Sequence, residues 1–272
     1  MSKKWLVGLS TVAVVGLAVL AGVGLTRTTG NSKRVETTQP VEDQRFEKLA
    51  QFLLFDDLQS ALSGAESVFS KEEAMHVFGV SMAVNAQKLS ADYEANEVTA
   101  DQKYKGAPLL ITGTISGIRK DFVDVPYVSL VGDGYLHDVQ ASFGSKTTGT
   151  LAKLAKGQKM VIVCEVGEQI VTEVMLKKCI PVNDFTLEHR SAANSYIDQV
   201  VSGKVQINQK TAELVGDLYE VAHLLPQQSG CFTEDEKTCQ ADMEQFAKST
   251  DKAQKQKIQA EANAFIAKLN VR

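Results

Sequence analysis

Short apolar runs alternate with turn residues between residues 105 and 182, and this pattern predicts β-strands. Residues 137–143 have a period of two, which places Val139, Ala141 and Phe143 on one face and polar side chains on the other. The other runs that predict strands are residues 105–118, 125–131, 160–166 and 174–182. Residues 150–156 are rich in helix formers and end at Gly157, so we expect a helix there.

The order of these elements predicts the fold of the central region. Three strands, a helix and two more strands over about ninety residues are the order of an OB-fold, a five-stranded Greek-key barrel. Gly113 and Gly117 interrupt the first strand, and isolated glycines in a strand mark a bulge or a sharp bend. A first strand that serves two sides of a barrel needs such a residue. Gly132 to Gly134 is a turn between the second and third strands.

Helical patterns flank the predicted barrel, so the fold class is α+β. Apolar spacing predicts an amphipathic helix over residues 42–62, and Ser70 with Glu73 forms a capping box that opens a second helix. A third helical stripe contains Leu89, Tyr93, Asn96, Ala100 and Tyr104. Because Asn96 lies on this stripe, we expect it to be buried and hydrogen-bonded to the backbone of the first strand. Further helices are predicted over residues 186–201, 207–225 and 240–269.

The N-terminal region predicts attachment to a membrane. Residues 5–25 are uncharged, and a helix of this length is about 31 Å long, which matches a hydrocarbon core of about 30 Å. We favour an uncleaved transmembrane anchor, and a cleaved signal sequence is the alternative. Lys3 and Lys4 favour a cytoplasmic N-terminus, with the bulk of the chain exported. The predicted parts are an anchor or signal sequence (1–27), a flexible linker (28–45), a helical region (46–91), the OB-fold barrel (92–183), and a C-terminal helical region with a cysteine-bracketed loop (184–272).

The net charge indicates which kind of partner the chain binds, and the cysteines indicate the cellular compartment. The chain has a net charge of −4, and residues 92–183 contain ten Lys and Arg against eleven Asp and Glu. A broad surface that neutralises phosphates is therefore not expected, and this argues against a nucleic-acid partner. Four cysteines beyond an export segment suggest disulfides.

Three disulfide connectivities are possible. We favour Cys164–Cys179, which joins neighbouring strands, and Cys231–Cys239, which brackets a polar loop. Zinc is a weaker alternative, because there is no CxxC motif and no histidine near either pair. If the domain were cytosolic, all four thiols would be free.

Several short motifs in and before the barrel resemble one family. They are Leu89, Tyr93 and Asn96, then Ala100, Asp101 and Tyr104 to Gly106, then Gly113, Pro126 to Val128, Leu151 to Gly157, and Cys179. In this combination the chain resembles the bacterial tRNA-anti-like OB-fold family over about residues 89–182. The resemblance implies an OB-fold in a bacterial, often membrane-attached protein, and thus a single-pass inner-membrane protein whose C-terminal bulk is in the periplasm or outside. The family name records a fold similarity to anticodon-binding domains and does not imply an activity.

No catalytic motif accompanies this fold. The sequence lacks a phosphate-binding glycine loop followed by Lys and Ser or Thr, and it lacks HExxH and GxSxG. The four histidines are far apart in the sequence. We therefore expect a protein that is not an enzyme and that has no cofactor and no metal. An enzyme whose site the sequence does not reveal is a further alternative, which a deep pocket lined by perturbed titratable groups would favour.

The predicted function is binding. We expect an envelope module whose second and third strands, with the adjoining loops, present a groove to a protein, peptide or glycan. The candidate binding residues are Arg119, Lys120, Phe122, Tyr127, Tyr135 and His137. The alternative is single-stranded nucleic acid, with the aromatic residues stacking on bases and Arg119 and Lys120 contacting phosphates. The sequence leaves the ligand and the oligomeric state open.

Overall fold

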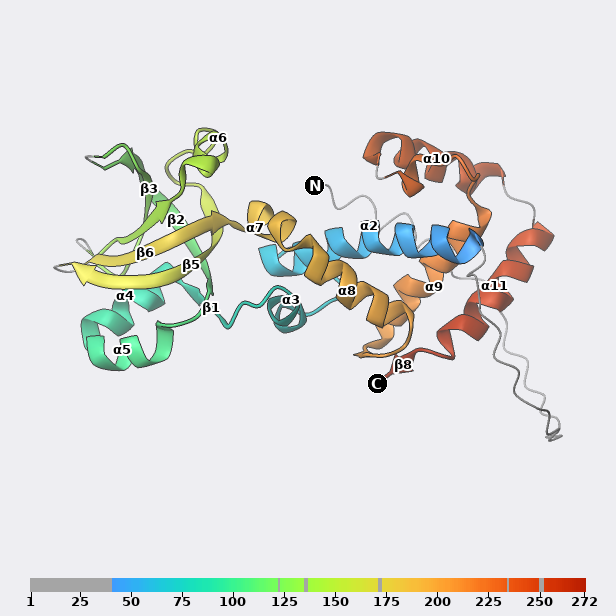
Figure 1. The fold of residues 1–272 in the computed structure, drawn as a ribbon, viewed down its shortest axis with the longest axis horizontal. Helices are drawn as coiled ribbons and strands as arrows, with labels where there is room; N and C mark the ends of the chain where they lie inside the picture. The colour runs from blue at the N-terminus through green and yellow to red at the C-terminus, as the bar shows by residue number, and fades with distance from the viewer. Residues whose placement is uncertain (1–40, 122, 135–136, 171–172, 234, 250–251) are drawn as a thin grey trace. The chain divides into compact units, whose positions relative to one another are not determined.

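The computed structural model describes residues 41–272 except residues 122, 135–136, 171–172, 234 and 250–251 (Figure 1). These residues form two compact units, one of Leu53–Val205 and one of the described residues before Leu53 together with Gln206–Arg272. The predicted transmembrane segment at residues 5–25 lies outside the described residues. Among the helices that are described, none has the length and apolar composition needed to cross a bilayer.

The first unit contains a closed five-stranded barrel. Its strands are β2 (Leu109–Lys120), β3 (Pro126–Leu130), β4 (Val139–Phe143), β5 (Lys159–Ile170) and β6 (Glu173–Pro181). They pair in the order β2-β3-β4-β6-β5, and β5 pairs again with β2, which closes the sheet. Only β4 and β6 run parallel among these five. The predicted five-stranded barrel and the α+β class are confirmed.

Strand β2 serves two sides of the barrel, as predicted. Leu109 to Thr114 pair with β5, and Ile115 to Lys120 pair with β3. The register with β3 shifts between Ile115 and Gly117, which is the bulge that the glycines indicated. Gly113 has a different role, because a Cβ atom there would lie 3.1 Å from the Cβ atoms of Ala86 and Leu130.

Both ends of the barrel are covered. The α4 (Ala86–Ala95) and α5 (Glu97–Tyr104) helices lie at one end, and η1 (Ser145–Thr147) and α6 (Thr148–Leu151) lie at the other (Figure 1). A sixth strand, β1 (Met82–Asn85), runs parallel to the start of β2 and was not predicted. Inside the barrel, the alternate residues of each strand form a continuous apolar core, which includes Leu109, Ile111, Val128, Leu130, Val139, Ala141, Phe143, Ile162 and Leu176.

Asn96 corrects the prediction of one long helix before the barrel. It is exposed, and its Oδ1 atom accepts a hydrogen bond from the Thr99 backbone N at 3.1 Å. The residue therefore caps the N-terminus of α5 and separates it from α4. The prediction that Asn96 is buried against the first strand is wrong, because an asparagine at a helix break satisfies the backbone next to it instead.

The remaining helices flank the barrel in sequence. They are α2 (Val41–Ser63), α3 (Lys71–Val77), α7 (Val182–Glu188), α8 (Arg190–Val201), α9 (Gln209–Leu224), η2 (Gly230–Phe232), α10 (Glu236–Ser249) and α11 (Lys252–Ile266). The capping box before α3 is confirmed, since Ser70 and Glu73 each accept the other's backbone N–H. The second unit also contains a short parallel pair, β7 (Gln206–Ile207) with β8 (Asn270–Val271).

Several predicted boundaries differ from the structure. The helix predicted over 150–156 is only the four-residue α6, and the helix predicted over 240–269 is divided into α10 and α11. The strand predicted over 160–166 runs on to Ile170 as part of β5, so Gly167 lies inside it. The predicted linker at 28–45 overlaps α2, which begins at Val41.

Candidate binding face

The outer surface of β2, β3 and β4 has polar side chains in two cross-strand rows. Tyr127 lies opposite Arg119 on one side and opposite Ser142 on the other. Ser129 lies opposite Gly117 and Gln140 in the same way. These six residues alternate with the apolar residues that point into the core, and together they are called the binding face below.

The chemistry of the binding face is mostly that of neutral hydrogen-bonding groups. Arg119 is exposed and is the only charged residue in the two rows. Tyr127, Gln140 and Ser142 are half-buried, and Ser129 is buried, with 8% of its surface exposed. The Gln140 amide donates to the carboxylate of Glu173 on β6, which holds it in place. Such a face can contact a ligand through hydroxyl, amide, phenol and guanidinium groups.

Lys120 and the turn after it form one edge of the binding face. The Asp121 carboxylate accepts hydrogen bonds from the backbone N atoms of Val123 and Val125, both at 2.9 Å, and so it shapes the turn. Lys120 Nζ lies 3.3 Å from Asp124 Oδ1, and both side chains are exposed, so this ion pair is weak. At the tip of the turn, the Val123 side chain is 63% exposed.

His137 belongs to a different part of the barrel. Its Nδ1 atom lies 2.9 Å from Glu94 Oε2 on α4, and its carbonyl accepts a hydrogen bond from Ser90 Oγ at 2.8 Å. These contacts hold the connection between β3 and β4 against α4. The structure thus brings Arg119 and Tyr127 to one face and places Lys120 at its edge, whereas His137 packs against α4 at the end of the barrel.

Phe122 and Tyr135 lie outside the described residues, so their roles remain predictions. The sequence prediction left out Ser129, Gln140 and Ser142. Their signal was present, because the period of two in residues 137–143 already placed Gln140 and Ser142 opposite the core residues.

The helices α4 and α5 are joined by a reciprocal pair of tyrosine–aspartate hydrogen bonds. Tyr93 on α4 donates to Asp101 on α5 at 2.8 Å, and Tyr104 on α5 donates to Asp92 on α4 at 2.6 Å. The two rings stack with their centroids 6.3 Å apart. Both tyrosines are buried in the barrel core cluster, so these residues close the end of the barrel.

Three lysines also donate hydrogen bonds to these aspartates, and the hydrogen bonds of the network shift the pKa values of its members. Hydrogen bonds from Lys88, Tyr104 and Lys103 lower the pKa of Asp92 far below its usual range. The hydrogen bond from Lys105 and then that from Tyr93 lower the pKa of Asp101. Burial, followed by the hydrogen bond to Asp101, raises the pKa of Tyr93. Both carboxylates are therefore held in the charged form as structural acceptors.

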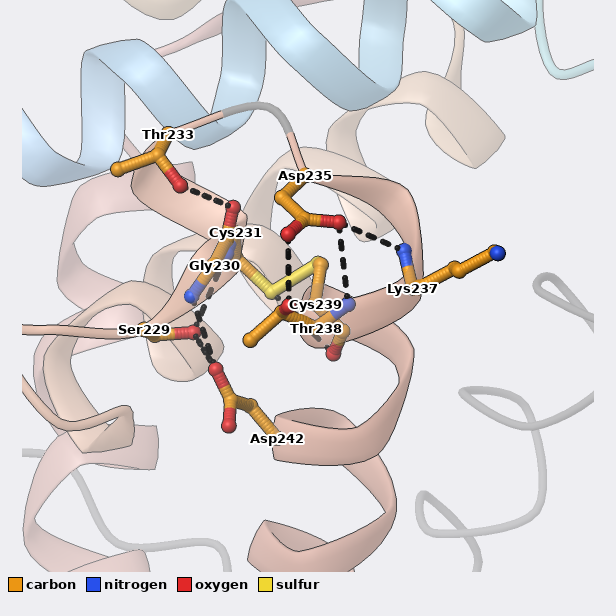
Figure 2. Close-up of a disulfide and its surroundings, with 9 residues drawn as sticks. All are labelled: Ser229, Gly230, Cys231, Thr233, Asp235, Lys237, Thr238, Cys239 and Asp242. Carbon is orange, nitrogen blue, oxygen red and sulfur yellow. Dashed lines mark hydrogen bonds between the residues drawn. A yellow bond between two sulfur atoms is a disulfide. The ribbon is translucent and has the colours of Figure 1, made fainter.

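Both favoured disulfides are present. Cys164–Cys179 joins β5 to β6, and Cys231–Cys239 joins η2 to α10. Figure 2 shows how the second bond is supported: the Asp242 carboxylate accepts from Ser229 Oγ at 2.7 Å and from the Gly230 N at 2.9 Å. The Asp235 carboxylate accepts from Thr238 Oγ1 at 2.7 Å near the start of α10. Since these sulfurs are bonded to each other, they are not thiolate ligands for zinc.

Two other polar features involve residues that do not belong to the binding face. A depression of about 340 Å³ is lined by Lys105 and Pro108 before β2 and by Glu165, Glu168 and Lys177 on β5 and β6. In the other unit, burial and then the neighbouring Glu213 raise the pKa of Asp217 to about 6. Within the part of the chain that the structure describes, no group of three or more His, Cys, Asp or Glu side chains is arranged to hold a metal.

A five-stranded barrel in the order β2-β3-β4-β6-β5, closed by β2 with β5 and with η1 and α6 between its third and fourth strands, has the topology of an OB-fold. The tRNA_anti-like family model matches residues 1–180, about two thirds of the chain, and the chain belongs to the tRNA_anti-like family. This confirms the resemblance seen in the sequence motifs. No curated protein matches the chain.

Two solved structures are similar over about a third of the chain. One is a protein from Klebsiella pneumoniae subsp. pneumoniae MGH 78578, provisionally described as a nucleic acid-binding lipoprotein. It is 20% identical, the match covers 36% of this chain and 91% of that chain, and the TM-score is 0.31. The other, from Leishmania major Friedlin, is provisionally described as an aspartyl-tRNA synthetase. It is 16% identical, the match covers 37% of this chain and 20% of that chain, and the TM-score is 0.26. Neither similarity bears on what this chain binds.

Proposed function

We propose that this protein is a non-enzymatic binding module that takes a protein, peptide or glycan partner on the binding face of its barrel. The observation that carries the proposal is the pair of cross-strand rows, Arg119–Tyr127–Ser142 and Gly117–Ser129–Gln140. They offer one cation, one aromatic ring and several neutral hydrogen-bonding groups. This composition suits a ligand that is recognised by hydrogen bonds and one stacking contact more than a ligand with a dense row of phosphates.

The proposed location is the outer side of a bacterial inner membrane, with residues 5–25 as the anchor. Two formed disulfides support this location, because disulfides persist in oxidising compartments and are rare in the cytosol. Both pairs are fully or almost fully buried, so they stabilise the fold and are not exposed thiols.

Single-stranded nucleic acid is the second candidate, and one observation favours it. Arg119 and Tyr127 face each other across β2 and β3, which would let a base stack on the ring while the guanidinium contacts a phosphate.

Site-specific photocrosslinking of the full chain in cells tests the proposal. A photoreactive phenylalanine analogue replaces Tyr127, and in a matched control it replaces Val98, which is 70% exposed on α5. We expect a crosslinked product from position 127 and not from position 98, and we expect protease or glycosidase, but not nuclease, to remove the captured partner. Equal capture from both positions would reject the binding face.

A nuclease-sensitive product would support the second candidate. In that case Arg119→Ala should weaken the binding of a single-stranded oligonucleotide and reduce the salt dependence by about one unit of slope. The same substitution should have little salt-dependent effect on a neutral peptide or glycan.

A further inference from the structure

One segment of the barrel carries four positive charges and no negative charge. Residues 139–164 contain Lys146, Lys153, Lys156 and Lys159 and no Asp or Glu, in a chain whose net charge is −4. All four lysines are exposed, and none of them forms an ion pair with any residue that the structure describes. Residues 144–159, which contain them, are called the lysine segment below.

The fold directs these charges outward from one end of the barrel. Leu151 is buried in the core cluster and Leu154 packs against it, so the apolar side of the lysine segment faces inward. Its end is held to β2 by hydrogen bonds from Gly157 N to Ile115 O at 2.8 Å and from Ile115 N to Gln158 O at 2.9 Å. Figure 1 shows α6, at the centre of this segment, at the opposite end of the barrel from α4 and α5. Thr150 in this segment donates a hydrogen bond to the Asp184 carboxylate at 3.0 Å.

The composition of the lysine segment indicates the kind of partner. Residues 144–159 include no aromatic residue and no arginine, so they lack both the rings that stack on bases and the planar forks that bind phosphates in two places. Four lysines without these groups attract an anionic surface through charge alone. Each lysine next to an anionic leaflet strengthens the binding of the protein to that leaflet about fivefold.

We propose that the lysine segment docks the barrel onto an anionic lipid bilayer through phosphate-bearing headgroups. The inference rests on the membrane attachment proposed above, because an anchored chain keeps the segment at a high effective concentration near the bilayer. Docking at this end leaves the binding face, on the outer side of β2 to β4, as a separate surface.

Headgroup crosslinking in vesicles tests this docking. The full chain is reconstituted into vesicles of phosphatidylcholine, with or without about one third phosphatidylglycerol. Both types contain a trace of a neutral lipid with a photoreactive headgroup, and mass spectrometry locates the crosslinked peptides. We expect crosslinks in residues 144–159 to rise at least about fivefold in the anionic vesicles, and to fall again at about 1 M salt, where the screening length is about 3 Å.

Two matched variants distinguish the effect of the lysine segment from the effect of the net charge of the protein. Lys146→Gln, Lys153→Gln, Lys156→Gln and Lys159→Gln together should remove the rise. The same four-charge change at Lys204, Lys210, Lys237 and Lys268, which are also exposed, should preserve it. Equal crosslinking in both vesicle types, or equal loss in both variants, would overturn the proposal. So would protection of residues 144–159 by a single-stranded oligonucleotide and not by anionic vesicles.

Flotation of the vesicles distinguishes a failure of the proposed membrane attachment from a failure of the proposed docking. A chain that does not float with neutral vesicles would contradict the membrane attachment. A chain that floats with both vesicle types but shows no anionic rise would contradict the docking alone.

Discussion

At the scale of single residues, Gly132 provides the sharpest test of the barrel. A Cβ atom at this position would lie 1.6 Å from the carbonyl oxygen of His137, so no side chain fits without moving the connection between β3 and β4. We expect Gly132→Ala to lower the free energy of unfolding by about 3 kcal/mol, as in other overpacked sites. Urea unfolding followed by circular dichroism measures this loss.

Gly149→Ala is the control for this substitution. A Cβ atom at Gly149 would have no neighbouring atom within 4 Å, and the residue has no positive φ, so alanine should be neutral or slightly stabilising in α6. If both variants unfold at the same urea concentration, the close approach of Gly132 to His137 is wrong.

For the residues near the binding face, the sequence predicted which side of a strand a residue lies on better than it predicted which residues it contacts. A period of two placed Gln140 and Ser142 on the polar side, because strand geometry alone decides this. The contacts of His137 with Ser90 and Glu94 join residues more than forty positions apart, and no local pattern contains that information. The structure therefore places His137 apart from Arg119 and Tyr127, and the binding roles of all three stay predictions.

At the scale of elements, the α4–α5 pair should depend on the charge of Asp92. Its pKa is lowered in the folded protein, so its contribution is fully present above the ordinary carboxyl pKa and is lost as the pH falls through the folded value. We expect Asp92→Asn to cost about 1 kcal/mol at pH 7, a figure reduced because the side chain is 21% exposed. Denaturation measured from pH 7 to pH 2 should show this difference shrinking on acidification.

Glu66→Gln is a suitable control, because Glu66 is an exposed residue of the loop between α2 and α3. It should change stability by less than about 0.5 kcal/mol at any pH in this range. A cost of Asp92→Asn that stays constant down to pH 2 would contradict the role of the charged form.

Element boundaries show where local patterns stop being informative. The capping box at Ser70 predicted the start of α3 correctly, since the two side chains and the backbone they bind lie within four residues. The break at Asn96 was missed because a capping asparagine and a buried asparagine fit the same helical spacing. Strand β1 was missed because its four residues gain their structure from pairing with β2, which lies more than twenty residues later.

At the scale of the whole molecule, the barrel was predictable and the two-unit division was not. Closure follows from the strand order and from a first strand with a glycine bulge, and both are visible in the sequence. The division places the first part of α2 with the C-terminal helices, a contact across more than 150 residues. Aromatic packing among Phe46, Tyr219 and Phe265, at 4.9–5.5 Å, accounts for it.

This division predicts that each disulfide stabilises its own unit. Cys164–Cys179 spans 15 residues in the barrel unit, and Cys231–Cys239 spans 8 residues in the other, so chain entropy gives about 3 and about 2.5 kcal/mol. We expect Cys164→Ala with Cys179→Ala to shift the unfolding of barrel peptides to lower urea, while peptides from α9 and α11 keep their midpoint. The other double variant should do the reverse. Hydrogen exchange with mass spectrometry, read peptide by peptide across a urea series, measures both shifts. If either variant lowers both midpoints equally, the chain unfolds as one cooperative unit and the two compact units are not independent in stability.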